Sequence, residues 1–158
     1  MTVDYKEAIS IADQKKKLFQ EYESITDVLL TTEDYDVMGN YITYRTKLAN
    51  DIDKLSKQLE KMLQLAGRQA DCIDYILGKQ SGHYVLCDEE QTIFAITEET
   101  KAVVRRIRLK DNDLIRECER RQKENVENLK ATQNTPKISR YLRNLSIPQD
   151  SLNNLGSV

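Results

Sequence analysis

The chain has no tryptophan, two prolines and only three cysteines among its 158 residues. The prolines are Pro136 and Pro148, so nothing before residue 136 carries the strongest helix breaker. Aromatic residues are also scarce, at 6% of the chain, whereas charged residues make up 32%. This composition is typical of long solvated helices and disfavours a sheet core.

The cysteines Cys72, Cys87 and Cys118 are too few and too scattered for a disulfide framework, and an odd number cannot pair fully. They indicate free thiols in a reducing compartment. The first residues, MTVDYKEAIS, lack the basic head and apolar block of a signal peptide. No apolar run approaches the ~20 residues of a membrane span. We therefore expect a cytoplasmic protein that does not enter the membrane.

Charge is distributed unevenly along the chain. Up to Glu99 there are 11 basic against 19 acidic residues, and from Thr100 onward there are 13 against 7. Two sections of opposite sign fit a basic helix packed on acidic helices. They fit equally well a basic face offered to an acidic partner.

The stretch from Met38 to Ile76 organises the chain, because apolar residues recur there at spacings of three and four. This heptad pattern predicts one helix over about 33–78, in which the stretch from Met38 to Ile76 alone would be roughly 58 Å long at 1.5 Å per residue. Only Arg45 and Gln69 interrupt the apolar seam, whose other members are Met38, Tyr41, Leu48, Ile52, Leu55, Leu59, Met62, Ala66, Ile73 and Ile76. A helix of this length needs partners of similar length to bury its stripe.

A first partner helix is predicted over about 4–30. Only a short joint, Thr31 to Asp34, separates it from the next helix, so the two should be antiparallel neighbours. A Thr or Asp of this joint can cap the second helix. The expected neighbours are Leu29 with Met38, Leu18 with Leu48, and Ile11 with Leu55. The first helix is too short to cover the second half of its partner.

A third helix is predicted over about 89–132. The segment 83–96 reads either as a β-hairpin or as the start of this helix, capped at Asp88 with Gln91 three residues on. We favour the helix, because the apolar spacing continues into the following segment. Asp111, Arg121 and Asn125 occupy seam positions. Either this part pairs through polar contacts, or its face stays partly open for a partner.

Pro136 opens a short amphipathic helix over about 136–145, and the polar residues 148–158 are expected to be a disordered tail. The predicted fold is therefore all-α: an antiparallel three-helix coiled-coil bundle with a short C-terminal helix. Residues 1–147 would form one domain. A heptad stripe can pack against a second copy of the chain as well as against another helix of the same chain, so a homodimer remains an alternative.

The sequence predicts no catalytic residue, metal site or cofactor. Cys72, His83 and Cys87 invite a zinc interpretation, but a structural site needs a fourth nitrogen or sulfur ligand. The only histidine has no nucleophile and base arranged around it. A basic run from Arg105 to Lys110 could follow phosphates, but acidic residues interrupt its continuation, and nucleic-acid binding is not the favoured interpretation.

Residues 29–55, LLTTEDYDVMGNYITYRTKLANDIDKL, resemble the flagellar export chaperones of the FliT type, with the related FlgN group. The likeness consists of a Leu pair ending a short helix, an acidic D-Y-D joint, and a helix with an Arg and the turn Leu48, Ile52, Asp53 and Leu55. The third helix followed by Lys137 to Tyr141 is a weaker match. The segment 70–96 departs from the pattern, because the connection is longer here.

The resemblance implies a non-catalytic chaperone that holds a flagellar or secretion-system subunit unpolymerised for export. The client's terminal amphipathic helix would bind a groove along Val103, Ile107, Leu114 and Cys118. A competing autoinhibitory C-terminal helix would carry Ile138, Tyr141, Leu142 and Leu145. The alternative is a general coiled-coil adaptor or scaffold. The apolar spacing agrees with this implication in one respect. The stripe of the third helix is interrupted by polar residues, and helix-in-groove recognition uses such an incompletely covered surface.

Overall fold

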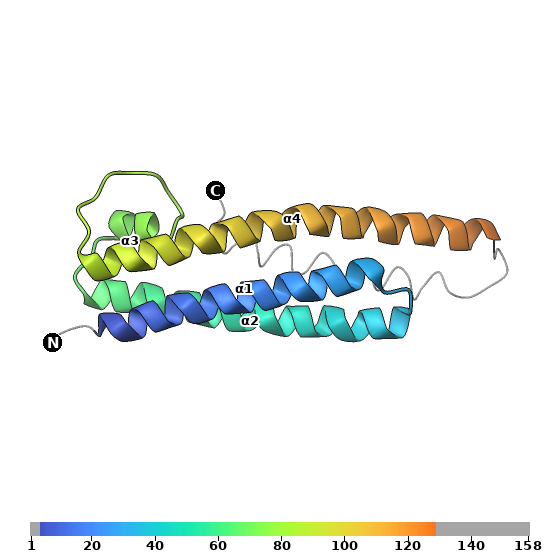
Figure 1. The fold of residues 1–158 in the computed structure, drawn as a ribbon, viewed down its shortest axis with the longest axis horizontal. Coiled ribbons are helices and arrows are strands. Elements are labelled where there is room, and N and C mark those ends of the chain that lie inside the picture. The colour runs from blue at the N-terminus through green and yellow to red at the C-terminus, as the bar shows by residue number, and fades with distance from the viewer. Residues whose placement is uncertain (1–3, 129–158) are drawn as a thin grey trace.

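The structure is a computed structural model that describes residues 4–128, a range that contains helices and no strand (Figure 1). The helices are α1 (Tyr5–Thr31), α2 (Tyr35–Leu65), α3 (Ala70–Ile76) and α4 (Asp88–Asn128). The all-α prediction is confirmed. The three long helices lie lengthwise together, with α2 running opposite to α1 and α4. The predicted C-terminal helix over 136–145 and the tail over 148–158 fall outside the described residues.

The first two helices begin where the sequence predicts, at aspartate caps. The Asp4 carboxylate accepts hydrogen bonds from the backbone N–H groups of Lys6 and Glu7, at 3.0 and 3.4 Å. Asp34 does the same for Asp36 and Val37, at 2.8 and 3.3 Å. Each cap satisfies N–H groups that have no partner inside the helix. The three-residue connection between the helices turns the chain back on itself.

The prediction of one continuous helix over 33–78 is wrong, because α2 ends at Leu65. Gly67 has a φ of 84°, a left-handed conformation that stops the helix. The backbone N–H of Gly67 donates to the Gln64 carbonyl at 3.0 Å, and that of Arg68 donates to the Leu63 carbonyl at 3.3 Å. This pair of bonds is the Schellman arrangement of a glycine-terminated helix. The heptad spacing continues past Gly67 although the helix does not.

The chain after Gly67 folds into α3, which packs against the C-terminal half of α2. Gln69 precedes α3, and its side chain makes no capping hydrogen bond. Cys72, Ile73 and Ile76 of α3 are buried in the same cluster as Leu59 and Leu63 of α2. A second left-handed glycine, Gly78 with a φ of 74°, ends this short helix. The separate helix thus helps to cover the part of α2 that the sequence left without a partner.

Replacing Gly67 tests this helix stop. Nothing lies within 4 Å of the position that a Cβ atom would take, so backbone strain is the expected cost of an alanine. Gly67→Ala should lower the free energy of unfolding by about 1–2 kcal/mol in urea denaturation followed by circular dichroism. Gly67→Asn should cost less, because asparagine tolerates the left-handed region. Equal stability of the alanine variant would contradict the left-handed turn.

The segment 83–96 contains the start of α4, so the helical alternative is confirmed over the hairpin. The N-cap residue of α4 is Cys87, one residue earlier than the expected Asp88. The backbone N–H of Cys87 donates to the Glu90 carboxylate at 3.0 Å, and the Gln91 N–H donates to the Cys87 carbonyl at 2.9 Å. Glu90, rather than Gln91, is therefore the capping side chain. Its choice follows from its burial beside Arg68, a tertiary contact that the local pattern cannot show.

Of the three long helices, α1 packs most closely against the other two. Its backbone approaches both, whereas no Cα atom of α2 comes within 8 Å of a Cα atom of α4. Three successive clusters of apolar side chains fill the bundle. The expected neighbours fall into them pair by pair: Ile11 with Leu55, Leu18 with Leu48, and Leu29 with Met38. None of the described helices is both long and apolar enough to cross a membrane.

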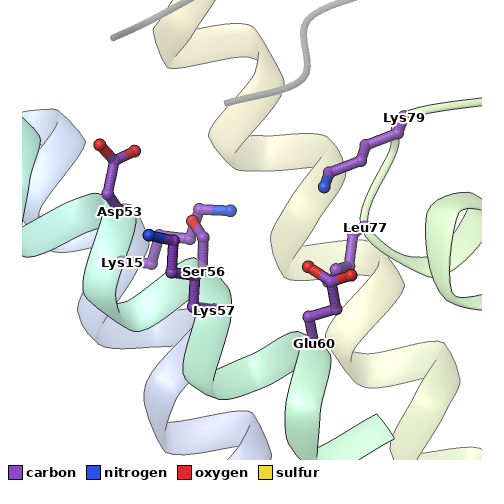
Figure 2. A pocket seen from close by; sticks show the side chains of 7 residues that line it. All are labelled: Lys15, Asp53, Ser56, Lys57, Glu60, Leu77 and Lys79. Atoms are coloured by element: carbon purple, nitrogen blue, oxygen red, sulfur yellow. The ribbon is translucent and has the colours of Figure 1, made fainter. Parts of the chain in front are cut away.

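A pocket of about 280 Å³ opens between α1, α2 and the chain that follows α3 (Figure 2). Its walls come from segments that are far apart in the sequence but meet at the α3 end of the bundle. The lining residues are Lys15, Asp53, Ser56, Lys57, Glu60, Leu77 and Lys79.

Candidate partner-binding site

The four residues predicted to line a client groove all lie on one face of α4 and are buried. Val103 and Ile107 belong to the middle cluster, with side chains of α1 and α2. Leu114 and Cys118 belong to the cluster at the far end, with Leu29 of α1. Burial raises the pKa of the Cys118 thiol. These side chains are thus part of the closed bundle, and a client could reach them only if α4 moved away from its neighbours.

The seam between α2 and α4 contains a buried ion pair. Arg45 of α2 is fully buried, and its Nη2 donates to Asp111 Oδ1 of α4 at 2.8 Å. The same nitrogen donates to the Tyr22 hydroxyl of α1 at 2.5 Å, and the guanidinium lies over the Tyr22 ring, 4.3 Å from its centre. One arginine therefore connects all three long helices. Arg45 and Asp111, which interrupt the predicted apolar seams of two different helices, are therefore partners in the structure.

This buried network is incompletely satisfied. Arg45 Nε, Arg45 Nη1 and Asp111 Oδ2 are buried without a hydrogen-bond partner in the part of the chain that the structure describes. Burial raises the pKa of Asp111, and the attraction of Arg45 only partly opposes it. Burial likewise raises the pKa of Tyr22 to about 12. The direction of the Asp111 shift indicates that burying its carboxylate costs more than the attraction of Arg45 returns.

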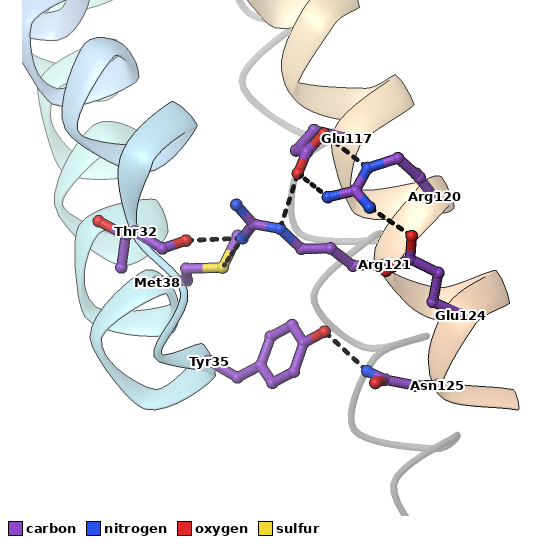
Figure 3. A network of polar contacts seen from close by, with 8 residues as sticks. All are labelled: Thr32, Tyr35, Met38, Glu117, Arg120, Arg121, Glu124 and Asn125. Carbon is purple, nitrogen blue, oxygen red and sulfur yellow. Dashed lines mark hydrogen bonds and ion pairs between the residues drawn. The ribbon is translucent and has the colours of Figure 1, made fainter. Parts of the chain in front are cut away.

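Farther along α4, polar contacts again replace apolar packing (Figure 3). Arg121 Nη1 donates to the Thr32 carbonyl at 2.6 Å, and its Nε donates to Glu117 at 3.0 Å. The Asn125 amide donates to the Tyr35 hydroxyl at 3.0 Å. Of the two possibilities that the sequence left open, polar pairing is the one observed at Asp111, Arg121 and Asn125. The second half of α4 is therefore attached to the α1–α2 end by hydrogen bonds.

Two basic residues of α4, Arg106 and Lys110, pair with acidic residues of α1. Glu23 accepts hydrogen bonds from Arg106 Nε at 2.9 Å and from Lys110 Nζ at 3.0 Å, and Lys110 also pairs with Asp27 at 2.8 Å. The Arg106 hydrogen bond is the main cause of a lowered pKa at Glu23. These pairs support the interpretation of a basic helix packed on an acidic one. Because carboxylates of α1 already neutralise the Arg106 and Lys110 charges, these side chains are less available to bind the phosphates of a nucleic acid.

The residues considered for zinc do not form a site. Cys72 is buried, whereas His83 and Cys87 are exposed. Within residues 4–128, no three His, Cys, Asp or Glu side chains are grouped as a metal ion would require. Partial burial raises the pKa of Cys87, and a thiol shifted in this direction is a poor nucleophile.

A second buried carboxylate, Glu90, was not identified from the sequence. It is fully buried and accepts a hydrogen bond from Arg68 Nε at 2.6 Å, while Arg68 Nη2 pairs with its other oxygen. Arg68 Nη2 also donates to the Val85 carbonyl at 3.2 Å. The pair ties the chain after α2 to the start of α4. A Glu three residues after a non-helical position was the signal that could have indicated it.

The predicted autoinhibitory residues Ile138, Tyr141, Leu142 and Leu145 lie outside the described residues. Comparison with protein families, with curated proteins and with solved structures found no match for this chain.

Proposed function

We propose that this protein is a non-catalytic, cytoplasmic helical chaperone for a flagellar or secretion-system subunit. It would bind the terminal amphipathic helix of its client and keep the client unpolymerised for export. In this proposal α1, α2 and α4 act as an antiparallel three-helix coiled-coil bundle, and the client approaches the side between α2 and α4.

The polar seam of α4 is the observation that supports this proposal most. A hydrogen bond between protein groups is exchanged for one with water or a partner at a net cost of about 0.5–1.5 kcal/mol. Exposing apolar area costs about 25 cal/mol per Å² with no such exchange. The second half of α4 is held partly by Arg121 and Asn125, so it can separate more readily than an apolar interface of the same length. Separation would expose Leu114 and Cys118.

The spacing of the helices also supports binding between α2 and α4. Their backbones stay more than 8 Å apart at every Cα pair, although both approach α1. Once α4 has moved away from its neighbours, a client helix entering from this side would meet Val103 and Ile107 of α4 together with Leu48 of α2. Helix-in-groove recognition requires such a row of apolar side chains at helical spacing.

The proposed competition by the C-terminal helix can be tested by deletion. Removing residues 136–158 should tighten binding of a client helix by about tenfold, a coupling typical of competing sites. Fluorescence anisotropy would use labelled peptides from the terminal helices of flagellar cap and hook-associated subunits. Removing only residues 148–158 is the matched control and should leave the affinity unchanged.

Unchanged affinity after the longer deletion would remove the competition mechanism. Absence of binding by all forms of the chain, to every such peptide, would contradict the chaperone proposal itself. An adaptor or scaffold would instead be an obligate oligomer that loses stability on dilution, which sedimentation over a range of concentrations would detect.

A further inference from the structure

The pocket at the α3 end of the bundle gathers charged side chains that have not paired with one another. Lysines reach it from α1, from α2 and from the chain after α3, and two carboxylates of α2 complete it (Figure 2). Among residues 4–128, no ion pair within 4 Å is formed by any of these five groups: Lys15, Lys57, Lys79, Asp53 and Glu60. By contrast Lys16, the next residue along α1, pairs with Glu99 at 2.9 Å.

Lys15 is held in an unfavourable environment for a cation. Its side chain is half-buried between helices, where the ammonium loses water. This burial lowers the pKa of Lys15 to about 8, the nearby Lys79 ammonium lowers it further, and Asp53 only partly opposes the shift. Two like charges therefore face the same pocket, and one of them is poorly hydrated.

Ser56 provides an independent observation at the same place. Its hydroxyl lines the pocket and is buried, yet it has no hydrogen-bond partner in the described part of the chain. A buried hydroxyl without a partner is costly, and proteins satisfy most such groups. Lys15, Lys79 and Ser56 thus supply two ammonium groups and a hydroxyl donor for which residues 4–128 provide no acceptor.

An oxyanion in the pocket would relieve these costs together. We propose that the pocket binds a small phosphate-bearing ligand, with its oxygens accepting from the ammonium groups of Lys15 and Lys79 and from the Ser56 hydroxyl. Lysine binds phosphate as a point charge, whereas the planar, bidentate recognition of carboxylates favours arginine, which the pocket lacks.

The two carboxylates limit the size of the ligand. Asp53 and Glu60 stand in the wall beside Lys57, so a chain of several phosphates would meet negative charge as it extended. A volume of about 280 Å³ leaves room for a phosphate group and for part of the molecule that carries it. The pocket therefore suits a monophosphate and disfavours nucleic acid and polyphosphates. This inference does not depend on the proposed chaperone function.

Competitive acetylation of the full chain at pH 8 tests the proposal without any substitution. Inorganic phosphate is compared with chloride at equal ionic strength, and the rate at each lysine is read by mass spectrometry. Half of the Lys15 amine is free at pH 8 when its pKa is about 8. If bound phosphate raises this pKa by about one unit, the free-amine fraction, and hence the acetylation rate, falls by about fivefold. Lys17 of the same helix, with a side chain that is 68% exposed, is the internal control and should not change.

Variants then locate the site. Lys79→Gln and Ser56→Ala should each reduce the protection of Lys15, whereas Lys54→Gln, on the exposed face of α2, should leave it intact. Equal rates at Lys15 in phosphate and chloride would overturn the proposal. Equal protection of Lys17 would also overturn it, because the effect would then not be localised to the pocket. Equal protection of Lys15 by acetate would overturn it as well, because the pocket would then not be selective for phosphate.

Discussion

Replacing Asp111 with alanine should lower the free energy of unfolding by about 3–5 kcal/mol, because the fully buried Arg45 guanidinium would lose the counter-charge with which it pairs among residues 4–128. Asp111→Asn should cost less, since its amide oxygen can still accept from Arg45 Nη2. Urea denaturation followed by circular dichroism measures both. The cost arises mainly from stranding a charge in the core, rather than from the net value of the pair.

The matched control removes both charges at once. Arg45→Met with Asp111→Val should be far more stable than Asp111→Ala alone, because apolar replacement of a buried ion pair is often neutral or stabilising. The network favours this outcome, since three of its polar atoms already lack partners. A double variant as unstable as the sum of the single variants would contradict the account, and would mean that the two residues act independently.

Replacing Glu90 with glutamine should lower the free energy of unfolding by about 2–3 kcal/mol, because the charged hydrogen bonds with Arg68 are lost. The glutamine amide oxygen can still accept from the Cys87 N–H, so the cap on α4 is retained. Glu89→Gln is the matched control, because Glu89 is the exposed neighbour in the same first turn. It should change stability little. Equal effects of the two substitutions would contradict the role of the buried pair.

The same variant predicts a pH dependence with a definite sign. The Arg68 hydrogen bonds lower the pKa of Glu90 from 4.5 in the unfolded chain to about 2. Its contribution is therefore complete above pH 4.5 and is lost as the pH falls through about 2. The stability difference between the natural chain and Glu90→Gln should shrink over this range. A difference that stayed constant would show that ionisation of Glu90 does not stabilise the fold.

Local sequence rules predicted the helices where local physics decides them. The cap in the joint before α2 and the antiparallel pairing of α1 with α2 were predicted, because a cap and a short connection involve residues a few positions apart. The end of α2 was missed, since Gly67 changes the backbone without interrupting the heptad spacing. A single glycine inside a helix costs only about 1 kcal/mol relative to alanine, so it does not by itself indicate a helix end.

Some features of the candidate site could likewise be predicted from the sequence, and others could not. Sequence alone showed that Arg45 and Asp111 stand in apolar seams, and that the basic half of the chain could pack on the acidic half. It could not show that these two residues meet, because nothing local relates positions 66 residues apart. The burial of Val103, Ile107, Leu114 and Cys118 is also a tertiary fact, since α1 and α2 cover them.

The sequence by itself determined an all-helical chain, the lengthwise pairing of its first two helices and the absence of a proline break before residue 136. Periodicity and capping act over a few residues, so they can be read directly. Only the tertiary structure decided which polar residues became partners, which lysines share a pocket with Ser56, and which apolar face is closed. These depend on how three long helices align, and alignment is set by the sum of packing across the whole bundle.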